Sequence, residues 1–324
     1  MVAMIGENHV REIADMAMAL DVVEKAFRKI GLEEATNSPR SRAQTDHAHI
    51  YGMFAGAKGL QSLGLKVRTT SRKGLPEHIV LLFHSKTGEL ACIMQAEYLE
   101  QLRGGAAGGL GIKTLARSGA SSIGLIGSGT QARMQLRAAA MVRPLQSASV
   151  YSPNRERASA FAAEMSQEMG FEITVAPHAR EAVRGKEIVI LATTSRDPVF
   201  FEDWVEPGMH INAVGATFLG KSEVAAEAFR KIELVVVDHR ESARLEAGDL
   251  VEPLEREFVH WRSIRDLGPM LVGRYEARTG PEQTTLFKSV GLGIQDVTLG
   301  QAILEKAKTL NIGGTLPWKN ETPV

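Results

Sequence analysis

The sequence predicts an α/β protein in which a doubly wound parallel sheet is inserted into a second, α+β domain. Three observations support this prediction. A short apolar strand at residues 121–126 runs into a Gly-x-Gly-x-x-Ala turn that opens a helix, strand and helix patterns alternate from there to residue 238, and patterns of a different kind lie on either side. Such alternation is what a right-handed parallel sheet requires.

Composition sets the frame for this fold. The chain has 324 residues, of which 44% are hydrophobic, so it can bury a full core and is long enough for two domains. Lys and Arg total 38, as do Asp and Glu, so no overall field recruits nucleic acid or an anionic membrane.

Cysteine content and the N-terminal residues bear on the compartment. The single cysteine, Cys92, excludes an intrachain disulfide and a multi-cysteine zinc site, which fits a reducing environment. The first residues are charged and lack a signal-peptide core, and no run approaches the roughly 18 apolar residues of a membrane span. We therefore expect a soluble, cytoplasmic protein.

The turn after the first apolar strand has the form of a dinucleotide-binding loop. Its two glycines let the backbone turn tightly and approach a pyrophosphate, and the helix behind them offers unpaired N–H groups and the positive end of its dipole. That helix is predicted over residues 130–142, which contain no breaker before Pro144. This Rossmann-type loop assigns the pyrophosphate site to Gly127, Gly129, Thr130, Gln131 and Ala132.

The elements after this loop continue the alternation. A second strand is expected at residues 147–151 and a second helix at 155–169, and apolar strands follow at 187–192, 210–214 and 233–238. Strands this apolar are typical of a parallel sheet that is buried on both faces. The dinucleotide-binding domain is therefore predicted to cover residues 118–290.

The flanking segments are predicted to form the other domain together. Strand-like runs occur at residues 51–54 and 79–83, and a helix is expected at 297–310. Because that last helix has an apolar face that needs a partner, we expect it to pack on the N-terminal segment, so that residues 1–117 and 291–324 form one domain. An earlier helix ends at Gly31 and has an apolar face made by Leu20, Val23, Ala26, Phe27 and Ile30.

Short motifs stand in a characteristic order along nearly the whole chain. They are Gly64-Leu65-Lys66-Val67, Thr87-Gly88-Glu89-Leu90, Leu102-Arg103, Leu115-Ala116-Arg117, the Gly127 loop with Gln131-Ala132, Thr193-Thr194-Ser195, Ala213-Val214-Gly215-Ala216, Gly220-Lys221-Ser222-Glu223, Phe287-Lys288-Ser289-Val290-Gly291 and Gln295-Asp296. In order and spacing the chain resembles the ornithine cyclodeaminase/mu-crystallin family, whose members include cyclodeaminases, ketimine and imine reductases and an archaeal type of alanine dehydrogenase.

This resemblance implies a homodimer that binds a nicotinamide dinucleotide and a small imino or amino acid. The domain of residues 1–117 and 291–324 would serve both substrate binding and dimerisation. The substrate carboxylate would be held by Arg42, Lys66 and Arg103, and Arg40, on the same loop as Arg42, is an alternative to it. The further cofactor-binding residues that the resemblance implies are Thr193, Thr194, Ser195, Val214, Gly215, Lys221, Ser289 and Gly291.

Two departures from the family pattern bear on the reaction. Thr217 stands where cyclodeaminases carry an aspartate that moves a proton during deamination and ring closure, and a hydroxyl is poorly suited to that task near neutral pH. A reductase needs only a positioned imine, a hydride and a proton, which Lys66 or water can supply, while Thr217 hydrogen-bonds the substrate nitrogen. Gly104 stands where the family usually has threonine, which predicts an altered or roomier substrate pocket.

The end of the second strand bears on the choice of cofactor. An NAD-specific loop normally has an acid there, which accepts hydrogen bonds from the ribose 2′-hydroxyl. In this chain Ser152, Asn154 and Arg155 follow the strand instead, a set that suits a 2′-phosphate. The sequence therefore favours NADP(H) over NAD(H).

The combined prediction is an NAD(P)H-dependent reductase of a small imino acid, either a cyclic ketimine carboxylate or a 2-imino acid, or a dehydrogenase in the reverse direction. The alternatives are a cyclodeaminase or hydroxyproline dehydratase-type lyase of the same family, and a non-catalytic binding protein, against which the intact Lys66 and Arg103 argue. No metal site is expected, because His47 and His49 have no cluster of cysteines or carboxylates beside them.

Overall fold

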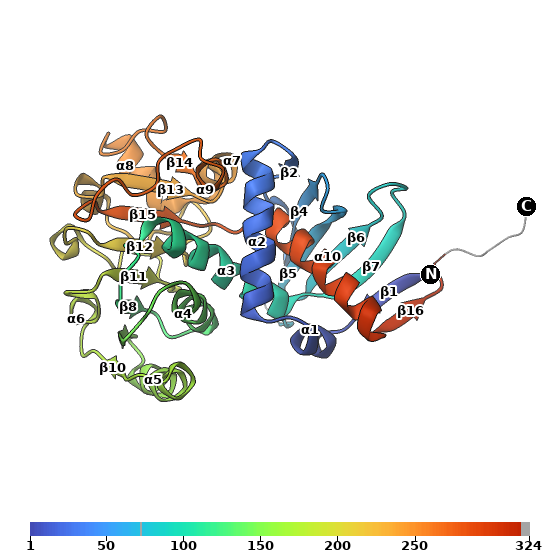
Figure 1. The fold of residues 1–324 in the computed structure, drawn as a ribbon, viewed down its shortest axis with the longest axis horizontal. Helices are drawn as coiled ribbons and strands as arrows, with labels where there is room; N and C mark the ends of the chain where they lie inside the picture. The colour runs from blue at the N-terminus through green and yellow to red at the C-terminus, as the bar shows by residue number, and fades with distance from the viewer. Residues whose placement is uncertain (72, 319–324) are drawn as a thin grey trace, which may run out of the picture. The chain divides into compact units, whose positions relative to one another are not determined.

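The computed structural model describes residues 1–71 and 73–318 (Figure 1). Packing divides the chain into two compact units, unit 1 and unit 2. Unit 1 comprises Met1–Arg103 and the chain from Leu292 onward, and unit 2 comprises Gly104–Gly291. Unit 2 contains a parallel sheet and unit 1 a separate mixed sheet, so the predicted fold class is confirmed.

Unit 1 is built on a sheet whose strands run in the order β16-β1-β7-β6-β5-β4-β2, with β3 also paired to β4. The pair β1 and β7 is parallel and its other pairs are antiparallel. The strands predicted at residues 51–54 and 79–83 lie within β4 and β6. The strands are β1 (Val2–Ile5), β2 (Ala35–Asn37), β3 (Ser41–Gln44), β4 (Ala48–Ala57), β5 (Ser62–Ser71), β6 (His78–Phe83), β7 (Leu90–Gln95) and β16 (Gly314–Leu316).

The long C-terminal helix of unit 1 packs on this sheet. It contacts β4, β5 and β6, and Figure 1 shows it beside α2. This confirms that the helix predicted at residues 297–310 packs on the N-terminal segment, although it begins earlier, at Gly293. The helices of unit 1 are α1 (Glu7–Ile13), α2 (Met16–Gly31), the start of α3 (Glu97–Leu115) and α10 (Gly293–Leu310).

Side chains alternate between the two faces of this sheet, as a pleated strand requires. The row facing α10 is buried and consists of the register partners Met53, Lys66, Val80 and Met94. The adjacent row points the other way, is exposed or half-buried, and consists of Phe54, Leu65, Leu81 and Ile93. Lys66 is therefore a charged residue on the inner face of a sheet.

Unit 2 contains a parallel sheet with the strand order β10-β9-β8-β11-β12-β15-β13-β14. The chain leaves β8 in one direction toward β9 and β10 and then returns to β11 on the other side of β8, which is the order of a doubly wound sheet. The strands are β8 (Ser122–Ile126), β9 (Ser147–Tyr151), β10 (Ile173–Val175), β11 (Ile188–Leu191), β12 (His210–Ala213), β13 (Leu234–Val237), β14 (Arg265–Asp266) and β15 (Thr285–Lys288).

The helices of unit 2 follow its strands as predicted, and those over residues 130–142 and 155–169 have the predicted bounds. Asn154 caps the second of them, and Gly170 ends it in the left-handed conformation. The helical segments are α4 (Thr130–Val142), α5 (Arg155–Met169), α6 (Ala179–Val183), α7 (Arg240–Glu246), α8 (Val251–Glu255), α9 (Leu267–Leu271) and the 3₁₀ turns η1 (Glu202–Trp204), η2 (Ala226–Arg230) and η3 (Gly248–Leu250).

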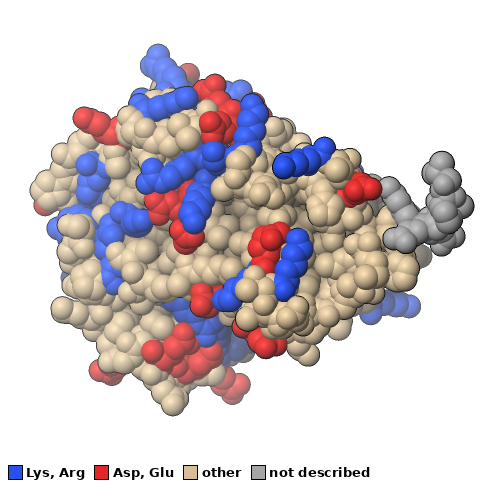
Figure 2. All heavy atoms as spheres, turned by 45° about the vertical axis from the view of Figure 1, so that its right-hand side comes forward, with Lys and Arg blue, Asp and Glu red and all other residues tan. Residues whose placement is uncertain are grey.

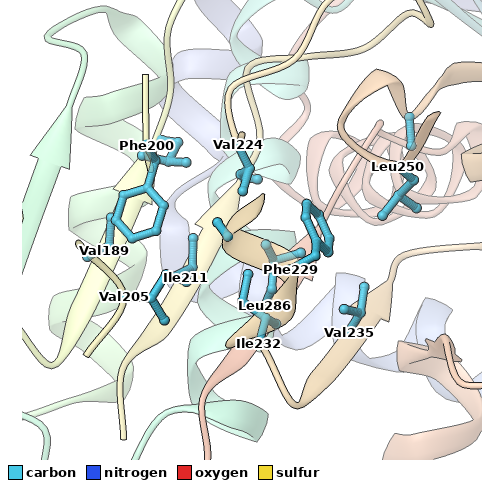
Figure 3. Close-up of a cluster of buried hydrophobic side chains, with 14 of the residues drawn as sticks. Val189, Phe200, Val205, Ile211, Val224, Phe229, Ile232, Val235, Leu250 and Leu286 are labelled. Atoms are coloured by element: carbon cyan, nitrogen blue, oxygen red, sulfur yellow. The ribbon is translucent and has the colours of Figure 1, made fainter. Parts of the chain in front are cut away.

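Hydrophobic cores cover both faces of the parallel sheet. Along β11, Ile188 and Ile190 belong to one cluster, whereas Val189 and Leu191 belong to the other. Figure 3 shows part of the second cluster, in which Phe200 and Phe229 join strand residues such as Ile211. Burial on both faces explains why these strands are continuous apolar runs in the sequence.

The division between the units falls within α3, between Arg103 and Gly104. The sequence placed this boundary later, after residue 117. The glycines of the second half of α3 explain the difference, because they let this half pack closely against other elements of unit 2. A Cβ on Gly108 would collide with the side chain of Gln135, and one on Gly111 would lie 2.5 Å from Phe287.

Candidate functional site

The glycine loop of unit 2 has the backbone that its sequence predicts. Gly127 has a φ of 111°, and a Cβ there would collide with the carbonyl oxygen of Ala192. Gly129 is the N-cap of α4, and a Cβ on it would meet nothing within 4 Å. Gly127 is therefore required by the fold, whereas Gly129 leaves open space at a helix N-terminus that has no side-chain cap. A cradle of this kind fits a dinucleotide pyrophosphate.

The residues after β9 have different environments. The side chain of Asn154 caps α5, since its Oδ1 accepts a hydrogen bond of 2.9 Å from the backbone N–H of Arg157. Ser152 is half-buried and Arg155 is exposed in the first turn of α5. The cap fixes the first turn of α5, in which the Arg155 side chain is exposed.

A buried glutamate joins two loops that contain predicted cofactor residues. Glu223 accepts hydrogen bonds of 2.6 Å from the backbone N–H groups of Thr193 and Gly215, which follow β11 and β12. Lys221 Nζ donates to the carbonyl oxygens of the same two residues, at 2.9 and 2.7 Å. Burial raises the pKa of Glu223, and the nearby Asp249 carboxylate raises it further. Thr193, Gly215 and Lys221 are therefore held in one network at the carboxyl ends of parallel strands, where ligands of such sheets bind.

The neighbours of these residues lie in the same two loops. Thr194 is exposed, and the Ser195 hydroxyl donates a hydrogen bond of 2.7 Å to the carbonyl oxygen of Asp197. The backbone N–H of Val214 donates to the carbonyl oxygen of Leu191. Thr217 is half-buried in the loop after β12. Its neighbour Ala216 accepts a hydrogen bond of 2.5 Å from Lys288 Nζ.

Lys288 and Asp238 fix the chain after β15. Lys288 is fully buried and its Nζ lies 2.7 Å from Asp249 Oδ2. Asp238 Oδ2 accepts hydrogen bonds from the Ser289 hydroxyl and from the backbone N–H groups of Val290 and Gly291, at 2.8 to 2.9 Å. The Ser289 hydroxyl is thus already engaged within the protein, although it was predicted to bind the cofactor.

The space beside Gly104 is occupied. A Cβ on Gly104 would lie 2.7 Å from Oε1 of Gln131, a residue of the dinucleotide loop. The Gln131 side chain thus takes the volume that a larger residue at position 104 would fill, and the expected change in the substrate pocket stays a prediction.

In unit 1, Lys66 lies in a cluster of charged side chains. Its ammonium forms an ion pair with Glu100 Oε2 and lies 3.5 Å from Asp296 Oδ1. The Lys66 side chain is only 2% exposed. Burial lowers the pKa of Lys66, and the carboxylates of Asp296 and Glu100 oppose that shift.

Arg103 joins the same cluster from α3. Its Nε donates to Asp296 Oδ1 at 3.1 Å, and its Nη1 donates to Gln295 Oε1 at 3.4 Å. Its Nη2 lies 3.6 Å from Glu100 Oε1. The structure thus brings together Lys66 and Arg103, which the sequence paired, and surrounds them with carboxylates that the sequence had not assigned.

The two arginines of the preceding loop differ in placement. Arg40 is half-buried with its guanidinium 5.5 Å from the Tyr51 ring centroid. Burial lowers the pKa of Arg40 to about 10, and the charge of Arg103 adds to this shift. Arg42 lies on β3 and is exposed. Arg40 is therefore the arginine whose charge is coupled to Arg103.

Three further features bear on a binding role: surface charge, groups of metal-ligating side chains, and helices that could cross a membrane. In the face shown by Figure 2, Lys and Arg are interspersed with Asp and Glu. Among residues 1–71 and 73–318, no three His, Cys, Asp or Glu are grouped to hold a metal ion. No helix in that part of the chain is both long and apolar enough to cross a membrane.

The fold and the dinucleotide loop, together with the basic cluster, define a Rossmann-type protein of the nicotinamide-dependent oxidoreductase class. The chain belongs to the ornithine cyclodeaminase/mu-crystallin family, whose model matches residues 2–311. This confirms the resemblance seen in the sequence.

Three relatives illustrate the match. The chain is 34% identical over 322 residues to Δ1-pyrroline-2-carboxylate reductase of Bacillus cereus (strain ZK / E33L), covering 95% of this chain and 98% of that protein. The structure of Thermococcus litoralis Δ1-pyrroline-2-carboxylate reductase in complex with NADH and L-proline matches with a TM-score of 0.92 and 32% identity, over 97% of this chain and 100% of that one. An archaeal alanine dehydrogenase dimer with bound NAD matches with a TM-score of 0.92 and 31% identity, over 98% and 99%.

Sequence reasoning missed the acidic partners of these sites. Glu100 precedes Arg103 by one helical turn, a spacing that places two side chains on the same helix face and was a usable signal. Asp238 directly follows an apolar strand, where a buried acid can organise the next loop. Asp249 lies in no motif, and only the tertiary structure brings it to Lys288.

Proposed function

We propose that this protein is an NAD(P)H-dependent reductase of a small imino acid, either a cyclic ketimine carboxylate or an open-chain 2-imino acid, or a dehydrogenase that works in the reverse direction. The observation that carries this proposal is the buried cluster of Lys66 and Arg103 in a chain that has threonine at residue 217. The relatives named for Δ1-pyrroline-2-carboxylate reduction and alanine dehydrogenation support the substrate class.

The open space beside Gly129 and the uncapped start of α4 support pyrophosphate binding at the Gly127 loop. When bound, a reduced nicotinamide supplies the hydride that the imine carbon accepts. Ala132, Thr130 and Gln131 open the helix behind the loop. The network around Glu223 would hold the backbone of Thr193 and Gly215 in place for the rest of the dinucleotide, with Thr194, Ser195, Val214 and Lys221 beside them and Ser289 and Gly291 fixed by Asp238.

Lys66 and Arg103 would bind the substrate carboxylate. An ammonium has three donors, so Lys66 can keep its contact to Glu100 and still bind a further carboxylate and the imine nitrogen. A guanidinium has five, so Arg103 can bind that carboxylate while it keeps its contact to Asp296. Arg40 is the better third ligand, since its charge is coupled to that of Arg103, and Arg42 is the alternative. Lys66 Nζ would then donate a proton to the imine nitrogen, and Thr217 would hydrogen-bond that nitrogen.

The experiment is to follow nicotinamide absorbance with Δ1-pyrroline-2-carboxylate, Δ1-piperideine-2-carboxylate, and pyruvate with ammonia. We expect turnover with at least one of them. The second candidate is a cyclodeaminase or hydroxyproline dehydratase, which would release ammonia or a pyrroline without net consumption of cofactor. Cofactor binding with no turnover of any imine would contradict the reductase proposal.

We propose that NADP(H) is preferred over NAD(H). The support is the absence of an acid directly after β9 and the exposed Arg155 in a turn oriented by the Asn154 cap. Ser152 is the third residue of this proposed 2′-phosphate site. Michaelis constants for NADPH and NADH test the preference, and a clearly lower value for NADH would overturn it.

We also propose that the protein is a homodimer joined through the outer sheet face of unit 1. The support is the apolar row of Phe54, Leu65, Leu81 and Ile93, in which Phe54 is 56% exposed. Light scattering of the wild type and of Phe54→Glu tests this, and a monomeric wild type would contradict it.

A cytoplasmic location remains a prediction of the sequence.

A further inference from the structure

One carboxylate lies at the centre of the basic cluster of unit 1. Glu100 Oε2 contacts Lys66 Nζ and lies 2.7 Å from His78 Nδ1. Its Oε1 lies 3.5 Å from Arg68 Nη1 and 3.6 Å from Arg103 Nη2. Among the described residues of the cluster, no other acid contacts so many basic groups, since Asp296 contacts only Lys66 and Arg103.

With four basic groups around it, Glu100 is placed to act as an anion rather than as a proton donor. Burial by itself raises the pKa of the Glu100 carboxyl, but Lys66, His78 and Arg103 outweigh that effect and hold it well below its usual range. A carboxylate that stays ionised at neutral pH cannot serve as a general acid. It can instead fix the position and the charge of the groups around it.

Lys66 has a particular need for such a partner. It lies on the inner face of the sheet, 2% exposed, between the apolar neighbours Met53 and Val80 on the adjacent strands. An ammonium in this position loses its hydration and tends to become neutral unless carboxylates compensate. The charged groups facing it are Glu100 and Arg103 on α3 and Asp296 on α10, and beyond Glu100 lie Arg68 on β5 and His78 on β6.

We propose that Glu100 is the positioning residue that keeps Lys66 aligned and in its ammonium form for proton transfer to the substrate nitrogen. This role rests on the proposed reduction of an imine. In that step an N–H bond of Lys66 breaks and a new N–H bond forms on the substrate, while the imine carbon gains hydride from the reduced nicotinamide. The neutral lysine then recovers its proton from solvent.

The sign of the effect on activity follows from this role. An acid catalyst loses activity as pH rises through its pKa. Removing the Glu100 charge removes a group that raises the pKa of Lys66, so the basic limb of the rate profile moves to lower pH. We expect Glu100→Gln to lower kcat/KM at pH 8.5 by about tenfold or more, and by a smaller factor at pH 6.5.

The matched control is Glu97→Gln. Glu97 lies one turn earlier on α3 and is exposed. Its carboxylate accepts one long hydrogen bond, of 3.4 Å, from the side chain of Gln101. This variant makes the same change of charge on the same helix outside the cluster, and its pH profile should match that of the wild type. Glu100→Asp keeps the charge and should restore part of the activity at high pH.

A second measurement does not depend on activity. The Lys66 side chain can be followed by carbon NMR in protein labelled with ¹³C-lysine, with Lys66→Arg used to assign its signal. We expect the titration of Lys66 in Glu100→Gln to move to lower pH, and in Glu97→Gln to stay unchanged. If Glu100→Gln does not fold, as judged by thermal melting, Glu100→Asp serves in its place, with a smaller shift in the same direction.

The outcomes separate this role from the proposed function. An unchanged Lys66 titration in the Glu100 variants would overturn the positioning role, whatever the activity. A shifted titration supports the role of Glu100 even if the wild type reduces none of the imines, a result that would count against the proposed function alone. An equal loss of activity at every pH would indicate a merely structural role and would also overturn the proposal.

Discussion

The dinucleotide loop of unit 2 and the basic cluster of unit 1 are built in opposite ways. The loop is a continuous stretch, residues 127–132, whose geometry comes from backbone atoms and missing side chains. The cluster takes Lys66 from β5, Glu100 and Arg103 from α3, and Asp296 from α10. A site made by the backbone is visible in the sequence as a motif, whereas a site made by side chains from distant elements is visible only in part.

The largest effect is expected from Lys66→Met, which removes the buried ammonium from the basic cluster of unit 1 and leaves the dinucleotide loop unchanged. We expect kcat/KM for imine reduction to fall by about a thousandfold, because the carboxylate ligand and the proton donor are lost together. Dinucleotide binding, measured by fluorescence titration of the folded variant, should be unchanged.

The control for that variant is Lys58→Met, which changes an exposed lysine of the same unit and should leave activity as it was. Weak dinucleotide binding in Lys66→Met would show that the basic cluster and the dinucleotide loop are not functionally separate.

The next effect contrasts two glycines within the loop. Gly127→Ala should destabilise the protein by about 3 kcal/mol, because it adds both a collision with the Ala192 carbonyl and a strained φ. Gly129→Ala should melt like the wild type, since its Cβ meets open space, yet bind the dinucleotide at least tenfold more weakly. Thermal melting and fluorescence titration of both variants test this, and equal dinucleotide affinity in Gly129→Ala would contradict a pyrophosphate site there.

A smaller effect is expected at the end of β9. Arg155→Ala should lower kcat/KM for NADPH by about tenfold and leave the value for NADH nearly unchanged, because only the 2′-phosphate contact is lost. Arg157→Ala is the matched control, since Arg157 is an exposed residue of the same turn. Equal losses with both cofactors would remove Arg155 from the specificity site.

The smallest effect is expected at Gly104. The atom that a new Cβ would meet is the end of the flexible Gln131 side chain, which can swing away. Gly104→Ala should therefore change the free energy of unfolding by less than about 1 kcal/mol. Dinucleotide affinity should fall by about threefold if Gln131 helps to bind it.

Gly119→Ala is the control for that variant, because its Cβ would meet nothing within 4 Å. Unchanged affinity in Gly104→Ala would show that the position of Gln131 does not matter to the cofactor.

The parts of the fold that could be predicted were those with a local cause. The helices at 130–142 and 155–169 were predicted at their observed bounds. The first lies between the glycine turn and Pro144, and the structure shows the second between the Asn154 cap and Gly170. β15 was not predicted as a strand, since Thr285–Lys288 combines two apolar residues with a threonine and a lysine. Its Lys288 is buried only because Asp249 and the Ala216 carbonyl meet its ammonium.

The residues of the candidate site also fall into those with a local sequence signal and those without one. Lys66 and Arg103 were selected from family motifs, and the structure brings them within reach of the same two acids. The helical spacing to Arg103 could have pointed to Glu100, but the roles of Glu100 and Asp296 could not be assigned from the sequence, because a carboxylate gains its role from the charges that surround it. The difference between Arg40 and Arg42 also appears only in the fold, since the two residues are nearly equivalent in sequence but differ in burial.

The sequence by itself determined the family, the doubly wound sheet and the dinucleotide loop, because hydrophobic periodicity and glycine spacing act over a few neighbouring residues. Only the tertiary structure decided that the loop's Gln131 fills the space beside Gly104, that Asp238 holds the chain at Ser289, and that Glu100 lies against Lys66. The physical reason is the range of the interactions. Backbone conformation is set locally, whereas the charge state and position of a buried side chain depend on partners that folding brings from distant parts of the chain.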